Sequence, residues 1–284
     1  MTSTRSVDES GAVLVGRVGD TLPPHTLSWG PTDTILYALG VGARPPTELP
    51  LLNEALGPAV LPTYALVANF FAVASLRDTL GLGSTPIVHS AQSLELTRPL
   101  DPTGEVTVAA EVSAVYDTGK HAVIELTSRG EDGDGLLFTA RSETMALKAG
   151  GFGGDPRPAA APTPDLPPTA VVDDAVRAEQ AALYRLSGDR NQLHIDPAVA
   201  ARYGFDDVFL HGLCTLGFAA RAVISAAADG DPSALRSISC RFASPVMLDA
   251  PLRTEVWTGG DEVAFRTTQG DATALSAGTA IVGW

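Results

Sequence analysis

Residues 183–197, LYRLSGDRNQLHIDP, place three polar side chains of different chemistry within six positions. Asp189, Asn191 and His194 follow a Ser-Gly turn and stand just ahead of a helix-forming segment. A carboxylate, an amide and an imidazole at this spacing can hold and polarise one water molecule. The stretch therefore predicts a site that adds water to an activated carbonyl compound or removes it.

A second polar signal stands at His211-Gly212, where an almost wholly apolar helical segment begins. The first N–H groups of a helix have no partner inside it and lie at its positive end. Gly212 lacks a side chain, so an oxygen can approach its N–H closely, and we expect this amide to stabilise an oxyanion. His211 either points into the site or shapes its entrance. Asp196 precedes a proline and a helical run, which is typical of a helix N-cap.

Composition limits the class of partner. The chain has 284 residues, of which 45% are hydrophobic, and its formal net charge is −14. This charge argues against nucleic acid and anionic membranes as partners. The two cysteines suggest no disulfide framework, and residues 1–10 lack the apolar core of a signal peptide. The longest apolar run is too short to span a bilayer, and the last three residues match no targeting signal, so we expect a cytoplasmic protein.

The chain divides into two halves of similar size. Residues 150–170, rich in glycine and then in proline, predict a linker between residues 1–149 and residues 171–284. Three short matches relate the halves at nearly constant offsets of 147, 149 and 146 residues. They pair Leu36–Leu39 with Leu183–Leu186, Leu61–Thr63 with Leu210–Gly212, and Pro99-Leu100 with Pro245-Val246. The sequence thus predicts an internal duplication.

Each half predicts a helical segment, an apolar buried helix and a run of strands. We expect the long helices over 62–79 and 211–228. The strands are expected over 87–98, 104–116, 120–130 and 136–148, and over 235–244, 251–258, 262–269 and 272–282. Turn signals at 117–119 and 259–261 separate them. A buried helix wrapped by an antiparallel sheet, made twice, is an α+β architecture.

The pattern Y-R-L-S-G-D-x-N-x-L-H-x-D-P, followed by H-G-L-C-T, resembles the hydratase 2 group of the MaoC-like family. Residues 33–43, 61–67 and 150–154 resemble the first half of its two-hotdog members. The resemblance implies a double hotdog fold and an (R)-specific 2-enoyl-CoA hydratase, equally a (3R)-hydroxyacyl-CoA dehydratase. It implies that Asp189 and His194 share the water and that the Gly212 N–H receives the thioester oxygen. Gln192 stands where the family usually has proline, which should loosen the loop.

The duplication predicts one active site per chain. Gly42 aligns with Asp189, and Pro62-Thr63 aligns with His211-Gly212. The first half has no Asp-x-Asn-x-x-His pattern, and a proline has no N–H to donate. We therefore expect residues 1–149 to be a non-catalytic repeat that makes room for the acyl chain, as in the two-hotdog relatives. A homodimer is expected on the same resemblance.

Coenzyme A is anionic and belongs to the substrate, so arginines near the site are candidate contacts. Arg241 is the first candidate for a phosphate or adenine contact, and Arg190 and Arg221 follow. The loop GGFGG (150–154) precedes no helix, so we interpret it as a turn or linker and not as a phosphate cradle. His194 and Asp196 could offer two metal ligands, but no cluster has metal-ligand spacing, so no metal and no cofactor are expected.

Three alternatives remain at this point. The first is a dehydratase that acts on thioesters of acyl carrier protein, which the acidic charge of the chain disfavours. The second is a hotdog thioesterase, which would not need Asp189 and His194 together. The third is a non-catalytic acyl-CoA-binding subunit, in which neither side chain would have a chemical role.

Overall fold

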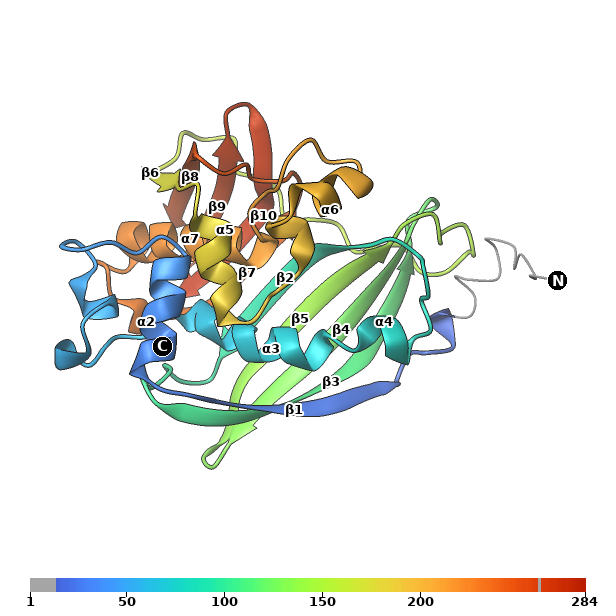
Figure 1. Ribbon diagram of the computed structural model, residues 1–284, viewed down its shortest axis with the longest axis horizontal. Coiled ribbons are helices and arrows are strands. Elements are labelled where there is room, and N and C mark those ends of the chain that lie inside the picture. The colour runs from blue at the N-terminus through green and yellow to red at the C-terminus, as the bar shows by residue number, and fades with distance from the viewer. Residues whose placement is uncertain (1–13, 260–261) are drawn as a thin grey trace.

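A single ten-stranded antiparallel sheet organises the computed structural model, which describes residues 14–259 and 262–284 (Figure 1). The N-terminal stretch and part of the predicted 259–261 turn lie outside the described residues. The strands run in the order β1-β3-β4-β5-β2-β7-β10-β9-β8-β6. Their bounds are β1 Thr21–Trp29, β2 Ile87–Leu96, β3 Gly104–Asp117, β4 Ala122–Asp132, β5 Gly135–Ala146, β6 Ala170–Val176, β7 Leu235–Phe242, β8 Ala250–Gly259, β9 Glu262–Gln269 and β10 Ala272–Val282.

The strand order reveals the duplication. Counted from either edge of the sheet to its centre, the strands of each repeat follow the same order: the first, third, fourth, fifth and second strand of that repeat. The two repeats meet where β2 pairs with β7. Ser93 lies opposite Ser239 at this junction, which corresponds to an offset of 146 residues. The predicted α+β double hotdog is therefore confirmed, with the two repeats sharing one sheet.

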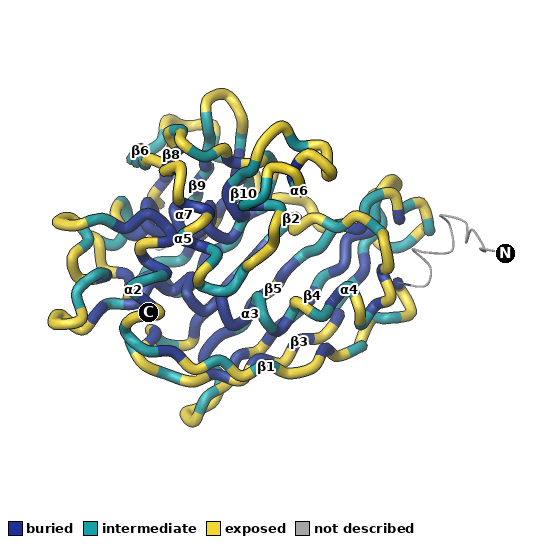
Figure 2. The backbone as a smooth tube through the Cα atoms, viewed as in Figure 1, coloured by how far each residue is buried: buried dark blue, intermediate teal, exposed yellow. Residues whose placement is uncertain are grey.

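The central helix of the second repeat is α7 (Gly212–Ala227), close to the predicted 211–228. It contacts all five strands of its repeat, and twelve of its residues are buried. Figure 2 shows the buried segments concentrated along α7, α3 and the inner strands. Apolar side chains cover this helix on nearly every side because sheet and neighbouring helices enclose it.

The expectation of one continuous helix over 62–79 is wrong. The segment divides into the 3-10 turn η3 (Pro62–Tyr64), α3 (Ala65–Val73) and α4 (Leu76–Thr79). At the start, Tyr64 N–H bonds the Leu61 carbonyl three residues back, and at the end Ala74 N–H bonds Phe71 in the same way. These three-residue bonds interrupt the α-helical ladder on both sides.

Two glycines allow close packing between the two repeats. Gly188 adopts φ +139°, and a Cβ there would lie 2.7 Å from the Phe71 ring of α3. Gly42 adopts φ +90°, and a Cβ there would lie 2.2 Å from the Phe218 ring of α7. The two phenylalanines are 147 residues apart, so the helices correspond at that offset. The predicted match at Leu61–Thr63, with its offset of 149, therefore departs from the helix register by two residues.

Shorter helices complete the helical layer. The helices α2 (Pro31–Gly40) and α5 (Gln180–Tyr184) carry the matched Leu-Tyr pairs and pack together, with Tyr37 and Tyr184 ring centroids 6.1 Å apart. The helix α6 (Pro197–Arg202) follows the polar motif. The 3-10 turns η1 (Leu49–Leu51), η2 (Glu54–Leu56), η4 (Arg185–Ser187), η5 (Gln192–His194) and η6 (Pro232–Ala234) occupy the connections.

The linker lies against the sheet. The predicted boundaries fall between β5 and β6, with Ala170 already in β6. Arg157 pairs with Glu143 of β5, and Pro156 bridges to Asp117. The Asp117 carboxylate accepts N–H bonds from Gly119, Gly151 and Gly153, and these bonds hold its pKa below the ordinary value. The GGFGG loop thus surrounds a carboxylate of the chain itself.

Candidate active site

The polar motif folds into two consecutive capped turns between α5 and α6. Gly188 ends η4, and the Asp189 carboxylate then accepts the Asn191 N–H at 3.1 Å. The Asn191 side chain in turn accepts the Leu193 N–H at 3.1 Å as the N-cap of η5. Asn191 is exposed, so its observed role is to fix the loop that carries Asp189.

His194, the last residue of η5, is 8% exposed. Its Nδ1 lies 2.9 Å from the Phe209 carbonyl oxygen. Because a carbonyl only accepts, Nδ1 must carry the proton, and Nε2 of the neutral ring keeps a free lone pair. The sequence motif therefore presents a hydrogen-bond acceptor into the site.

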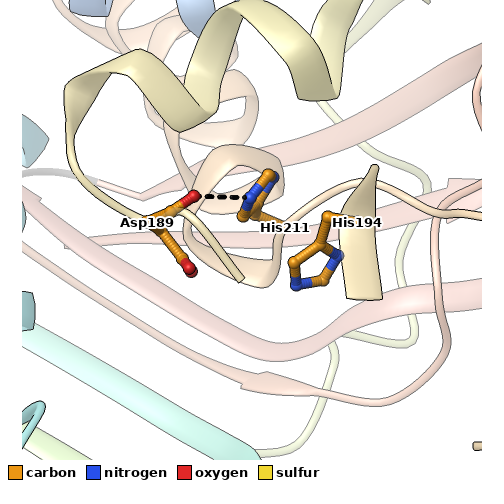
Figure 3. Close-up of side chains that lie close together, drawn as sticks. All are labelled: Asp189, His194 and His211. Carbon is orange, nitrogen blue, oxygen red and sulfur yellow. Dashed lines mark hydrogen bonds between the residues drawn. The ribbon is translucent and has the colours of Figure 1, made fainter. Parts of the chain in front are cut away.

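His211 is the N-cap of α7 and is 1% exposed. Its Nε2 donates to the Asp189 backbone oxygen at 3.1 Å, which ties the motif loop to the start of the helix (Figure 3). The Tyr184 ring packs on its other side, with the centroids 5.0 Å apart. This position explains how His211 shapes the site, and its predicted contact with substrate stays a prediction.

Asp189, His194 and His211 each offer one polar atom, and these atoms lie within 4.8 Å of one another (Figure 3). A water that donates two hydrogen bonds of about 2.8 Å at a tetrahedral angle joins acceptors about 4.6 Å apart. The Asp189 carboxylate and the His194 imidazole are therefore close enough for one water molecule to donate a hydrogen bond to each of them.

The same three residues correct the expectation that no group of possible metal ligands exists. The sequence suggested His194 and Asp196 as possible metal ligands, whereas the structure groups His194 with Asp189 and His211. The Asp196 carboxylate instead caps α6 by accepting the Ala198 N–H, as predicted. The His194 and His211 rings are tilted against each other, with centroids 4.0 Å apart and planes 34° apart. The absence of a metal stays our prediction.

Burial sets the protonation of the cluster. It raises the pKa of the Asp189 carboxyl, and it lowers the pKa of the His194 imidazole. Burial also lowers the pKa of His211 to about 3, and the neighbouring His194 acts in the same direction. Both imidazoles are therefore neutral at pH 7, and His194 is ready to accept a proton.

Acid should destabilise the fold through these histidines. Their pKa values lie below the ordinary 6.5, so the unfolded chain binds more protons once the pH falls below 6.5. The raised pKa of Asp189 opposes this effect. We expect the free energy of unfolding in urea to fall between pH 6.5 and pH 4, and His211→Gln should make that fall shallower. An equal slope in the variant would contradict the assignment.

Gly212 is the first residue of α7, and none of the described residues accepts its N–H. A Cβ at this position would lie 3.2 Å from the Phe242 ring of β7. The His89 ring of β2 packs on Phe242, with centroids 4.8 Å apart. Neither Phe242 nor His89 was predicted from sequence, because they meet only where β2 of one repeat pairs with β7 of the other.

Gln192 should tolerate the proline that its family usually has. Its N–H has no acceptor among the described residues, and Asn191 has φ −57° and ψ 123°, which suits a residue before proline. We expect Gln192→Pro to stabilise the fold by about 0.4–1 kcal/mol with activity unchanged. Thermal unfolding measures this, with Leu193→Pro as the matched control, since that change removes the N–H that Asn191 accepts. A less stable Gln192→Pro would show that the loop needs a different backbone.

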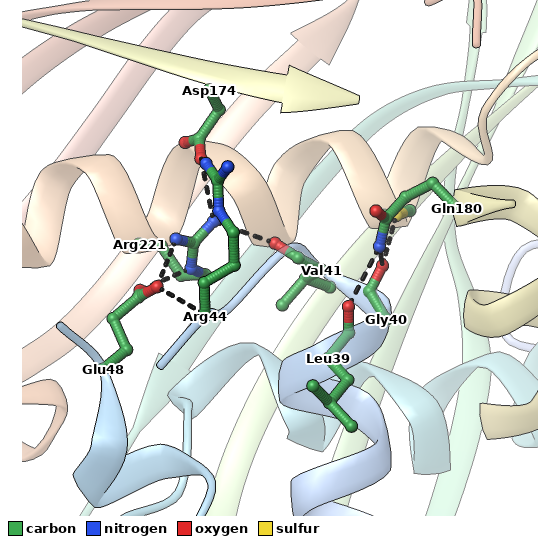
Figure 4. A network of polar contacts seen from close by, with 9 residues as sticks. Leu39, Gly40, Val41, Arg44, Glu48, Asp174, Gln180 and Arg221 are labelled. Carbon is green, nitrogen blue, oxygen red and sulfur yellow. Dashed lines mark hydrogen bonds and ion pairs between the residues drawn. The ribbon is translucent and has the colours of Figure 1, made fainter. Parts of the chain in front are cut away.

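The three candidate arginines lie in different places. Arg190 is exposed beside Asp189, and its contact with coenzyme A stays a prediction. Arg241 alternates with the inward Cys240 and Phe242 and donates to the Pro158 carbonyl on the opposite face of the sheet, so the structure does not bring it to the cluster. Arg221 is 9% exposed and bound to Glu48 and Asp174, which excludes the coenzyme contact considered for it (Figure 4).

The first repeat offers no equivalent chemistry at the aligned positions. Gly42 has no side chain, and its backbone lies against Phe218 of α7. Pro62 begins η3, and α3 itself begins three residues later at Ala65. Of the described residues, the possible ligand atoms that gather in a group of three all belong to the second repeat.

Known proteins resemble both halves. Residues 159–279 match the MaoC like domain, and residues 28–147 match the MFE-2 hydratase 2 N-terminal domain. The 3-hydroxyacyl-thioester dehydratase Y of Mycobacterium tuberculosis is 38% identical, with 90% of this chain and 91% of that protein covered. The peroxisomal multifunctional enzyme type 2 of Mus musculus is also 38% identical over 89% of this chain, which spans only 36% of that enzyme.

A solved structure agrees with these matches. The crystal structure of a MaoC-like dehydratase from Phytophthora capsici superposes with a TM-score of 0.83 at 30% identity, covering 94% of this chain and 97% of that one. The two family matches together cover both repeats, and the match to the MaoC like domain includes the motif loop. This chain therefore belongs to the hydratase 2 group of the MaoC-like dehydratase family.

Proposed function

We propose that this protein adds water to trans-2-enoyl-CoA thioesters to give (3R)-hydroxyacyl-CoA, and that it catalyses the reverse dehydration. The observation that carries the proposal is that Asp189 and His194 gather with His211, the residue before Gly212, whose N–H no described residue accepts. The names of the relatives, hydratase and dehydratase, support the same reaction.

The hydration needs a base for the water, an acid for C2 and a hydrogen-bond donor for the thioester oxygen, and the site offers a group for each. A C3–O bond and a C2–H bond form while one O–H bond of water and the π bond between C2 and C3 break. Asp189 and His194 each accept a hydrogen bond from the water, one of them takes the proton of the O–H bond that breaks, and that proton is given to C2. The Gly212 N–H donates to the thioester oxygen while that oxygen carries negative charge. Atoms and charge balance, because the proton taken from water is the proton given to carbon.

The acyl chain is proposed to extend into the first repeat, where the helix and sheet do not close tightly. An apolar gap lies between α3 and the strands β1, β3 and β5. It is lined by Leu27, Trp29, Tyr64, Ala65, Ala68, Leu100, Val106, Leu137 and Phe138. The absence of polar lining suits an alkyl chain.

Loss of the conjugated enoyl absorbance of crotonyl-CoA tests the reaction, and chiral analysis of the product tests its stereochemistry. We expect hydration to the (3R) alcohol without release of free thiol. Free thiol would indicate the thioesterase alternative, and an unchanged spectrum with bound ligand would indicate the acyl-CoA-binding subunit. The same assay on the acyl carrier protein thioester distinguishes the carrier.

Gly212→Pro should lower kcat/KM by about 10²–10³ through loss of the oxyanion donor. Proline suits the first position of a helix, and His211 has φ −60° and ψ 140°, so the helix should still form. Circular dichroism checks the fold. Gly212→Ala keeps the N–H and places only a Cβ near Phe242, so it should lose less activity. A folded proline variant with the wild-type rate would remove this amide from the mechanism.

The wider setting is also part of the proposal. We propose a homodimer in the cytoplasm, which light scattering and cell fractionation test. The mouse relative is named peroxisomal. No helix among the described residues is long and apolar enough to cross a membrane. Activity is expected without any added cofactor.

A further inference from the structure

Three buried polar side chains interrupt the apolar interface between α3 and the sheet in the first repeat. Asn69 of α3 and Gln92 of β2 are each 1% exposed, and Ser142 of β5 is 2% exposed. Gln92 and Ser142 lie opposite each other in the β2–β5 ladder. The three residues form a hydrogen-bonded chain from the helix down to the strands.

The donor and acceptor of each hydrogen bond among these three side chains can be assigned, starting from Gln92. The Gln92 amide nitrogen donates to the carbonyls of Ser93 and Arg141, at 2.8 and 3.0 Å. The Gln92 oxygen therefore accepts, and it takes the Ser142 hydroxyl at 2.9 Å. Ser142 accepts the Asn69 amide N–H at 3.0 Å. Among the described residues, none donates to the buried Asn69 Oδ1.

The second repeat has an apolar core at the corresponding positions. At the helix offset of 147 residues, Asn69 corresponds to Leu216 of α7. At the junction offset of 146 residues, Gln92 corresponds to Ile238, which lies opposite Ala280 as Gln92 lies opposite Ser142. All three are buried, so the fold does not require polar side chains in this layer.

A buried acceptor without a donor destabilises the fold, and an apolar core of the same shape avoids that loss. The first repeat is also the part of the chain into which the acyl group is proposed to extend. Ala68, which precedes Asn69, lines the apolar gap beneath α3. On β2, Gln92 stands three residues from His89, whose ring packs on Phe242 beside Gly212. The hydrogen-bonded residues thus adjoin, along α3 and β2, the lining of the apolar gap and the surroundings of Gly212.

We propose that Asn69 Oδ1 is a specificity determinant that accepts a hydrogen bond from a hydroxyl group on the acyl chain of the thioester. Because Asn69 Oδ1 is an acceptor, only a hydrogen-bond donor on the substrate can pair with it. The substrate class is therefore a 2-enoyl thioester with a hydroxyl remote from the double bond. This inference rests on the proposed hydration activity. The amide N–H groups of pantetheine are the other donors available, and every coenzyme A thioester carries them.

The test compares kcat/KM for trans-2-enoyl-CoA pairs of equal length, one plain and one with a single hydroxyl placed at successive carbons from C5 outward. The wild type should prefer the hydroxylated partner about three- to tenfold at one position. Asn69→Leu and Asn69→Ala should both abolish that preference while the plain substrates keep their rates. The two variants change the local volume in opposite directions, so a shared loss identifies the acceptor and not the shape.

Thr254→Val is the matched control, because Thr254 is a buried, hydrogen-bonded residue of the second repeat. It should keep the hydroxyl preference. A wild type that hydrates plain substrates but shows no preference at any position would overturn this inference alone. A preference that survives both Asn69 variants would also overturn it. A wild type that hydrates neither class would overturn the proposed function itself, and this inference with it.

Discussion

Asp189→Asn is expected to lower kcat by about 10²-fold or more while the fold stays intact. The asparagine keeps the size of the side chain and can still accept the Asn191 N–H that shapes the turn. It loses the negative charge that draws a proton from water and holds it near His194. Steady-state hydration of crotonyl-CoA measures the change, and His194→Gln should show a loss of the same order.

Asp196→Asn is the matched control for this prediction. Asp196 lies seven positions from Asp189 in the same motif, but its carboxylate caps α6 through the Ala198 N–H. Asparagine is an equally good N-cap, so this variant should keep both activity and stability. Wild-type rates in Asp189→Asn, or a large loss in Asp196→Asn, would mean that the wrong carboxylate has been assigned.

Arg221→Met should destabilise the protein by about 3 kcal/mol. The guanidinium binds both Glu48 oxygens at 2.6 Å and donates to the Val41 carbonyl at 3.1 Å. It also lies 3.4 Å from the Asp174 carboxylate, which is 9% exposed (Figure 4). Removing the arginine leaves these carboxylates without their buried partner. It also removes the ion pair that joins α7 to the first repeat, so urea unfolding should shift to lower denaturant.

Arg44→Met provides the comparison, because Arg44 also pairs with Asp174, at 3.2 Å, but is 41% exposed. An exposed pair of this kind contributes less than about 1 kcal/mol. Equal effects of the two variants, or a change below about 1 kcal/mol for Arg221→Met, would contradict the view that the buried cluster holds the repeats together.

The inner strands were predictable from sequence, whereas the edge strands were not. Alternating residues and turn signals predicted all eight strands from β2 to β5 and from β7 to β10, within a few residues at their ends. The strand β1 contains Pro23-Pro24, which argues against a strand in the interior of a sheet. The structure places β1 at the edge with a register shift between Leu22 and His25, where proline is tolerated. The other missed strand, β6, lies at the opposite edge.

The motif loop was predictable because its polar residues are close in sequence. The contacts that complete the site come from distant segments, and the sequence does not predict which residues meet. His211, itself a predicted candidate, contacts His194 from seventeen residues away, and Phe71 of the other repeat packs on Gly188. Arg221 gives the clearest case, since its partner Glu48 lies 173 residues away and converts an apparent surface arginine into a buried one.

The double variant Asp189→Asn/His194→Gln tests most directly whether both side chains act on the same water. If they do, either single change disables the pair, and the double variant should hydrate crotonyl-CoA about as slowly as the slower single variant. If the two losses multiply in kcat/KM, the side chains act independently, and the shared water at the start of α7 is contradicted.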